Sequence, residues 1–243
     1  MLFVTMSSEC SESICRSISN CTHLQDLILY GITLHDNILF QIRLTSISNC
    51  THLQTLHLDN TQLDGILDLS RLTNLTSLGL WNVTMSSECI EFLCGSISNC
   101  THLQILDLIG IALYNSILDP SRLTNLTSLS LWNVTMSSEC IESLCGSISN
   151  CIHLQALTLY GITLNDSILD LSRQTNLTYL MLENVTMSSK CSESLYRSIS
   201  NCTHLQELYL DDITLNDSIL DQSRLTHLRL ENVSMSSECS ESM

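Results

Sequence analysis

Cysteine and histidine side chains recur at fixed spacings along the 243-residue chain, and they are the residue types best able to bind a metal ion. The fullest example is Cys89-x4-Cys94-x5-Cys100-x-His102, and thiolate and imidazole are common zinc ligands. Structural zinc sites, however, usually pair ligands two to four residues apart. In a later copy Tyr196 replaces the middle cysteine, which a ligand set could not tolerate. We therefore predict that these cysteines are small buried core residues, with no bound metal and no cofactor.

Five histidines occupy one equivalent position, one residue before a recurring strand pattern, and could be taken for catalytic bases. Each would lie beside a copy of itself, which favours a hydrogen-bonding turn residue, because an active site needs one asymmetric cluster. The sequence contains no nucleophile elbow, no phosphate-binding glycine loop and no HExxH string. We predict that the chain is not an enzyme. These histidines are His23, His52, His102, His153 and His204.

The cysteines and histidines belong to an internal repeat, the first feature to seek in such a sequence. The string Cys-Thr-His-Leu-Gln, or Cys-Ile-His-Leu-Gln once, recurs every 51 residues from Cys100 onward, and Thr-Asn-Leu-Thr recurs between its copies. Counted on the first leucine of each unit, Leu103 and Leu126 lie 23 residues apart, and Leu126 and Leu154 lie 28 apart. The chain therefore alternates short and long units.

Each unit contains the pattern Leu-x-x-Leu-x-Leu, as in Leu103, Leu106 and Leu108. The last two leucines are two residues apart, so they point to one face of a β-strand while the residues around them point to the other. This pattern resembles the leucine-rich repeat over essentially the whole chain, with nine complete strand segments. The resemblance implies an open α/β solenoid over residues 1–243, a single domain with a concave parallel sheet and convex helices or turns.

The long unit predicts a helix after its strand. Ser86 is a suitable N-cap, and Cys89, Leu93 and Ile97 form an apolar stripe at helical spacing. This helix resembles that of ribonuclease-inhibitor-type repeats, as in NOD-like receptor sensor arrays. The short unit has room only for a turn or a single helical turn, with Pro120 at a first helical position. Its predicted caps are Asp68, Asp119, Asp170 and Asp221.

The turn after the strand departs from the family pattern. The asparagine expected there is replaced in short units, and in long units a valine takes its place with asparagine one position earlier. We therefore expect the polar backbone groups of this turn to find their hydrogen-bond partners in another way. The replacing residues are Ile32, Thr61, Ile111, Ile162 and Ile213 in short units and Val83, Val134 and Val185 in long units, the displaced asparagines being Asn82, Asn133 and Asn184.

Both ends of the sequence resemble interior parts of the repeat. Residues 2–6 match the strand end at 80–85 with one residue missing, and Met243 falls within an expected helix. About one unit is missing where Leu44 meets Ser46, which a stack of neighbouring units can tolerate. Neither end has a polar capping unit, so we expect a fragment of a longer array, with other domains of the parent protein outside this chain.

The side chains that flank the strand leucines differ from copy to copy, although the flanking strings barely change. They should lie on the exposed concave sheet, and they include both tryptophans and most tyrosines, the residue types that anchor interfaces. The alternative is that these positions vary between copies because nothing constrains them. However, exposed helix positions such as Glu91 and Glu142 are just as free and keep the same residue. The predicted partner-binding residues are Tyr30, Asp59, Trp81, Asp107, Trp132, Tyr160, Tyr179, Glu183, Tyr209, Asp211, Arg229 and Glu231.

The chain is strongly acidic, with 25 Asp and Glu against 9 Lys and Arg and a formal net charge of −16. Nucleic acid and anionic membrane surfaces are therefore poor partners, and no apolar run is long enough to span a bilayer. The acids predicted for the concave face favour a protein partner with a basic patch. Its association should be accelerated by the negative field and weakened by salt.

Thirteen cysteines at repeat-equivalent positions do not suggest a disulfide framework and favour a cytoplasmic protein. Recurring Asn-x-Ser/Thr strings, such as Asn82-Val83-Thr84, keep an extracellular location open. The resemblance implies protein recognition, in the first place as the ligand-sensing and autoregulatory part of an intracellular innate-immune signalling receptor. The alternatives are a free-standing adaptor, such as a substrate-recognition subunit in ubiquitin ligation, and an extracellular receptor module.

Overall fold

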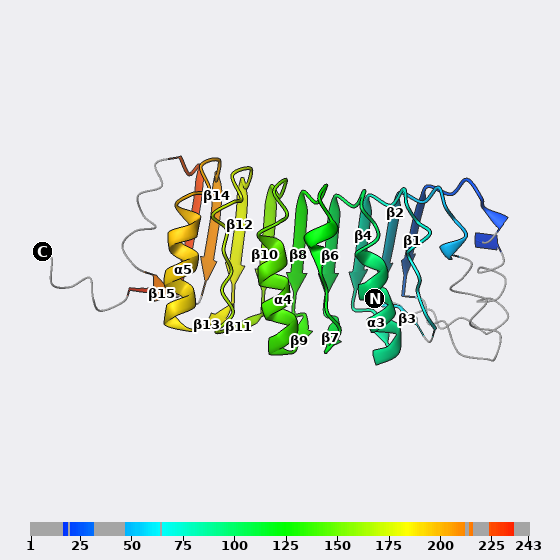
Figure 1. Ribbon diagram of the computed structural model, residues 1–243, viewed down its shortest axis with the longest axis horizontal. Coiled ribbons are helices and arrows are strands. Elements are labelled where there is room, and N and C mark those ends of the chain that lie inside the picture. The colour runs from blue at the N-terminus through cyan, green and yellow to red at the C-terminus, as the bar shows by residue number, and fades with distance from the viewer. Residues whose placement is uncertain are drawn as a thin grey trace, which may run out of the picture.

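The computed structural model describes residues 17–18, 20–31, 47–63, 65–211, 214–215 and 224–235. In these ranges nine strands form one sheet in which each unit adds a parallel strand beside the previous one (Figure 1). The predicted leucine-rich-repeat solenoid with nine strands is therefore confirmed. The strands are β1 (Asp26–Tyr30), β2 (Thr55–Asp59), β4 (Ser77–Trp81), β6 (Ile105–Ile109), β8 (Ser128–Trp132), β10 (Ala156–Tyr160), β12 (Tyr179–Glu183), β14 (Glu207–Asp211) and β16 (His227–Glu231).

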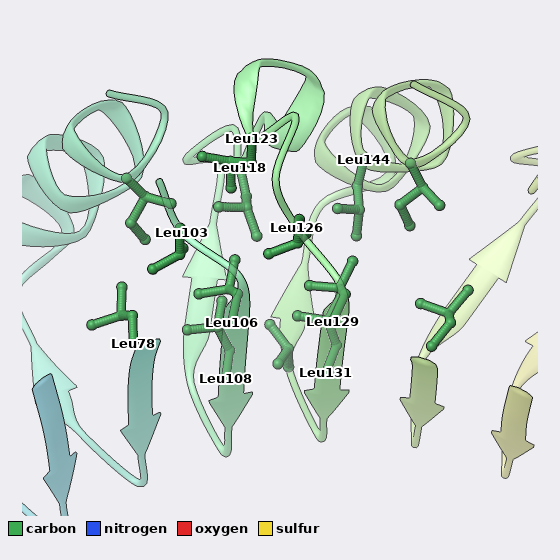
Figure 2. Packing of buried hydrophobic residues seen from close by; sticks show 14 of the residues in the cluster. Leu78, Leu103, Leu106, Leu108, Leu118, Leu123, Leu126, Leu129, Leu131 and Leu144 are labelled. Atoms are coloured by element: carbon green, nitrogen blue, oxygen red, sulfur yellow. The ribbon is translucent and has the colours of Figure 1, made fainter. Parts of the chain in front are cut away.

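Stacked leucines form the core of the array. Neighbouring strands pair in register, so Leu106 lies beside Leu129 and Leu108 beside Leu131. All four side chains are at most 1% exposed. Figure 2 shows them pointing from the strands toward the helix layer, where Leu144 closes the core from the other side. Because each leucine contacts its equivalents in the adjacent units, the apolar core runs without a break along the array.

In the part of the chain that the structure describes, three helices follow the strands of long units, as predicted: α3 (Ser87–Ile97), α4 (Ser138–Ile148) and α5 (Ser189–Ile199). The Ser86 hydroxyl accepts a hydrogen bond from the Cys89 N–H at 3.3 Å, which confirms it as the N-cap of α3. Leu93 and Ile97 are buried on the inner face of the helix. Among the described residues, no helix is long and apolar enough to cross a membrane.

In the short units, aspartates cap the tight turn that replaces the helix. Asp119 Oδ1 accepts a hydrogen bond from the Ser121 N–H at 2.9 Å. Here Pro120–Arg122 forms a single 3-10 turn (η1) with the proline at its first position. Asp68 and Asp170 accept equivalent bonds, so three of the four predicted caps are confirmed. Asp221 lies outside the described residues.

Short strands after the turn pair each short unit with the long unit that follows it. Four such two-stranded ladders are present in the described ranges, and each joins a short unit to a long one. The 51-residue super-repeat is therefore a structural pair as well as a sequence period. The ladders are β3 (Gln62–Leu63) with β5 (Thr84–Met85), β7 (Ala112–Tyr114) with β9 (Thr135–Met136), β11 (Thr163–Asn165) with β13 (Thr186–Met187), and β15 (Thr214–Leu215) with β17 (Ser234–Met235).

In the turn after the strand, residues in the left-handed backbone region supply N–H groups that are hydrogen-bonded to the next unit. Asn82 has a φ of 51° and Gly110 a φ of 62°, a conformation that glycine and asparagine adopt most readily. The N–H of each donates to the carbonyl at the strand end of the next unit, Asn82 to Ile109 at 2.6 Å and Gly110 to Trp132 at 2.8 Å. A Cβ on Gly110 would clash with Asn82 Oδ1. From Asn82 to Asn184 successive units therefore alternate asparagine and glycine at this position, whereas the adjacent units with Asn60 and Asn82 both have asparagine.

An asparagine ladder exists, but it lies before the strand. The Nδ2 of Asn74 donates to the Thr51 carbonyl of the preceding unit at 2.9 Å. Asn125 and Asn176 make the equivalent bonds. The recurring Thr-Asn-Leu-Thr string thus ties one unit to the previous one.

Several expectations fall on residues outside the described ranges. These are the strand at 2–6, the turn residues Ile32 and Ile213, the fused unit at 44–46 and the helix expected before Met243.

Candidate binding face

The first, third and fifth side chains of each strand point away from the leucine core. In β2 the side chains of Thr55, His57 and Asp59 are half-buried, while Leu56 and Leu58 are fully buried. Figures 1 and 2 show α3 and α4 on one side of the sheet, which leaves these side chains on the other. We call that side the open face. All twelve residues predicted from the sequence to bind a partner lie on it.

The parallel register sorts the open face into rows that cross the strands. Most of the predicted residues lie in the row made by the last residue of each strand, which we call the end row. Asp107, Tyr209 and Arg229 lie in the row of third residues, and Tyr179 lies in the row of first residues. The end row is Tyr30, Asp59, Trp81, Ile109, Trp132, Tyr160, Glu183, Asp211 and Glu231.

The middle of the end row is apolar and aromatic over four adjacent strands, from Trp81 to Tyr160. The rings of Trp132 and Tyr160 are stacked, with centroids 4.9 Å apart and planes at 19°. Ile109 lies between the two tryptophans in the register. Aromatic side chains that are fixed in this way lose little conformational freedom on binding, which suits them as anchors.

His57 and Gly79 form a feature that sequence reasoning missed. A Cβ on Gly79 would lie 3.0 Å from His57 Cδ2, so the imidazole lies over the glycine. His57 Nε2 is 3.1 Å from the Ser77 hydroxyl, and its ring lies against Trp81 with centroids 5.9 Å apart. Burial raises the pKa of the Asp107 carboxyl, and the nearby His57 partly offsets this shift. The available signal was Gly79 itself, the only glycine between strand leucines.

The last three residues of the end row are acidic and lie on adjacent strands. Arg229, the only arginine or lysine on the open face of the described strands, donates from its guanidinium to Glu231 at 2.8 Å. This bond lowers the pKa of Glu231, and together with Glu183 and Asp211 it raises that of Arg229. One cation thus faces a row of three carboxylates, and Glu207 lies beside them on β14.

A pair of tyrosines adjoins the acidic part of the end row. The rings of Tyr179 and Tyr209 have centroids 5.4 Å apart and planes at 36°. The Tyr209 hydroxyl donates to Glu207 at 3.0 Å, a bond that raises the pKa of the phenol. Burial and the carboxylates of Glu207 and Glu183 raise the pKa of Tyr179. Both shifts agree with a local negative potential.

The cysteines are core residues, as predicted. None of the ten cysteines in the described ranges forms a disulfide, and all but Cys21 are buried. Burial raises the pKa of Cys94 to about 12, so this thiol stays protonated. Cys100 Sγ donates to the Leu69 carbonyl of the preceding short unit at 3.8 Å. In the part of the chain that the structure describes, no three or more His, Cys, Asp or Glu gather as possible metal ligands.

The histidines before the strands are exposed turn residues, which confirms that interpretation. The rings of His23 and His52 lie tilted against each other at 33°, with centroids 5.4 Å apart. His204 Nδ1 lies 2.7 Å from the Thr175 carbonyl, within hydrogen-bond distance. These histidines lie away from the twelve predicted binding residues and form no asymmetric cluster.

Two hollows open on the helix side of the sheet. One, of about 540 Å³, is lined by Phe92, Gly95 and Asp68 among others, and the second, of about 710 Å³, by Gly146 and Ile168 among others. The glycines on α3 and α4 leave this space, where the equivalent residue of α5 is Arg197. None of the predicted binding residues lines either hollow.

No protein-family model matches the sequence, and no curated protein matches it either. Solved structures do match by shape. Internalin C2 from Listeria monocytogenes has a TM-score of 0.52 at 17% identity, over 92% of this chain and 85% of that one. A TDR receptor has a TM-score of 0.53 at 15% identity, over 94% of this chain and 46% of that one. The chain thus spans less than half the length of that receptor structure.

At these identities the matches speak for the fold alone. They agree with the nine parallel strands, the continuous leucine core and the alternation of strand with helix or turn. The chain has the leucine-rich-repeat fold.

Proposed function

We propose that this chain recognises another protein through the open face of its sheet. The observation that carries the proposal is the aromatic part of the end row, where Trp81, Ile109, Trp132 and Tyr160 follow one another on adjacent strands. These side chains stand on a face that no helix of the described residues covers (Figure 2), while the leucines behind them are buried. Interfaces owe most of their binding free energy to a few such anchors.

The proposed face can be tested by removing its two largest side chains. The double variant Trp81→Ala/Trp132→Ala should keep its fold, because both residues lie outside the leucine core. A partner captured by the wild type should be re-measured with purified proteins, and the double variant should bind it at least tenfold more weakly, about 1.4 kcal/mol or more.

The matched control is Phe92→Ala, which removes an aromatic side chain that is 53% exposed on the helix side of the sheet. This variant should bind the partner as the wild type does. The proposal fails if the double variant retains full affinity, or if Phe92→Ala weakens binding as much.

We further propose a cytoplasmic setting, in which the array is the ligand-sensing part of an innate-immune-type receptor. The buried thiols support a reducing compartment, since none of the ten described cysteines forms a disulfide. A free-standing adaptor is the alternative that these features fit equally. A nucleotide-binding segment upstream in the genomic reading frame would favour the sensor, and an F-box segment the adaptor.

The structure offers a reason other than glycosylation for some Asn-x-Ser/Thr strings. Asn74, Asn125 and Asn176 use Nδ2, the atom that would carry an N-linked glycan, to bond the preceding unit. This use supports the cytoplasmic proposal over an extracellular receptor module. The test is expression with a secretion signal followed by glycosidase treatment: a mobility shift that disappears on Asn74→Gln would contradict it.

A further inference from the structure

The end row changes character abruptly between β10 and β12. From Trp81 to Tyr160 it is apolar and aromatic, and from Glu183 through Asp211 to Glu231 it is acidic. Strands lie about 4.8 Å apart, so the aromatic part is about 14 Å long and the acidic part about 10 Å. A partner lying along this row meets two different chemistries in a fixed order.

The acidic part is unfavourable for the isolated protein. Like charges on directly adjacent strands repel each other, and nothing in the leucine core requires acids at these positions. Arg229 neutralises Glu231 through its bond at 2.8 Å, whereas Glu183 and Asp211 share no cation of their own on the open face of the described strands. A cationic partner would relieve this repulsion.

The tyrosine pair provides a second type of contact for a cation. The rings of Tyr179 and Tyr209 lie on β12 and β14, the strands that carry Glu183 and Asp211. Aromatic faces attract guanidinium and ammonium groups, most strongly where carboxylates stand nearby. Arginine suits this combination best, because its planar group stacks on a ring and binds a carboxylate with two donors.

We propose that the end row binds an extended segment of the partner that presents apolar side chains to Trp132 and Tyr160 and arginine or lysine to Glu183 and Asp211. The proposal rests on the proposed function and adds the chemistry and order of the bound segment. Two strand spacings separate Tyr160 from Asp211, about 10 Å, and an extended chain rises about 3.3 Å per residue. The apolar and basic residues of the segment should therefore lie about three residues apart.

Blocked, labelled peptides with the sequence Leu-Leu-Gly-Gly-Arg-Arg and its reverse test this order in both chain directions. Their counterparts with citrulline in place of arginine keep the shape but lose the charge. One of the two arginine peptides should bind the full chain about tenfold more tightly than its citrulline counterpart, since several partly exposed cation contacts contribute. Equal binding by the citrulline peptide, or no binding by any peptide, would overturn the proposal.

Two double variants that remove the same number of charges distinguish binding at the end row from attraction by the overall negative field of the protein. Glu183→Gln/Asp211→Asn should abolish the preference for arginine, whereas Glu91→Gln/Glu142→Gln, on exposed positions of α3 and α4, should preserve it. The first variant should melt no lower than the wild type, because it removes like-charge repulsion. If both variants lose the preference equally, the field and not the row attracts the peptide.

Failure of this proposal is distinguishable from failure of the proposed function. A protein partner whose binding depends on Trp81 and Trp132, combined with peptides indifferent to citrulline, would keep the recognition face and reject its cationic end. A partner indifferent to both tryptophans would instead reject the recognition face itself.

Discussion

Gly110 gives the sharpest test of how successive units fit together. Its φ of 62° lies in the left-handed region, and an added Cβ would clash with Asn82 Oδ1 in the preceding unit. Gly110→Ala therefore carries two costs, about 1–2 kcal/mol for the backbone conformation and a further cost for displacing the amide. We expect a total loss of about 2–4 kcal/mol in the free energy of unfolding.

A double-mutant cycle isolates the steric part of this loss. Asn82→Gly removes the amide that the new Cβ would meet and keeps a residue that tolerates the left-handed region. In the Gly110→Ala background it should restore about 1 kcal/mol or more, whereas alone it should change stability little. Urea denaturation followed by far-ultraviolet circular dichroism measures all four corners of the cycle.

Gly31 provides the matched comparison within the chain. Its φ of 63° is nearly that of Gly110, but an added Cβ would meet nothing within 4 Å among the described residues. Gly31→Ala should therefore cost only the backbone part, which amide hydrogen exchange at the neighbouring strand can measure locally. If Gly110→Ala costs no more than Gly31→Ala, and Asn82→Gly restores nothing, the alternation of asparagine and glycine is not a steric requirement.

Three further predictions concern the core and the caps. Gln174 is fully buried with its Oε1 unpaired in the described structure, at a position where the equivalent units have leucine. Gln174→Leu should therefore raise the free energy of unfolding by about 1 kcal/mol, measured by urea denaturation. A destabilised variant would show that the hydrogen bond from Gln174 Nε2 to the Ile148 carbonyl, at 2.9 Å, outweighs the cost of the unpaired Oε1. Leu106→Ala should cost about 2–5 kcal/mol and expose the adjacent strands in hydrogen exchange, and a loss below 1 kcal/mol would contradict the close packing. Burial opposes ionisation of Asp119, but hydrogen bonds from Ser147 and Ser121 outweigh it and lower its pKa. Its carboxylate thus stabilises the fold above its unfolded pKa of about 3.9, and the stability difference from Asp119→Asn should shrink as pH falls below that value; a constant difference down to pH about 2 would be the contrary result.

The fold was predictable because it depends on period alone. Leu106 and Leu108 repeat their spacing in every unit, and any stack that buries one copy buries them all. The N-cap Ser86 and the turn caps Asp68 and Asp119 were equally predictable, because capping is local to a few residues. Once the strands were placed, the alternation of side chains put all twelve predicted residues on one face.

Contacts between units were not predictable in the same way. The bond from Asn74 to the Thr51 carbonyl depends on how far one unit is displaced against the next, which no local pattern expresses. The same is true of His57, which lies over Gly79 on the neighbouring strand. The cellular location is harder still to predict from the fold, because the same solenoid serves many functions and only residues on its surface distinguish them.

The small ladders that join each short unit to the following long one make the two-unit block the natural module of this architecture. Inserting or removing a whole block recreates junctions that already exist, with a slim turn between two helices as between α3 and α4. Removing a single short unit would instead place two helices on adjacent units, where packed helices need about 8–10 Å against a strand spacing of about 4.8 Å, so the array would have to curve more strongly at that junction. Growth by duplication in steps of 51 residues, the distance from Cys100 to Cys151 and from there to Cys202, therefore preserves every junction, whereas the single unit missing between Leu44 and Ser46 breaks this period.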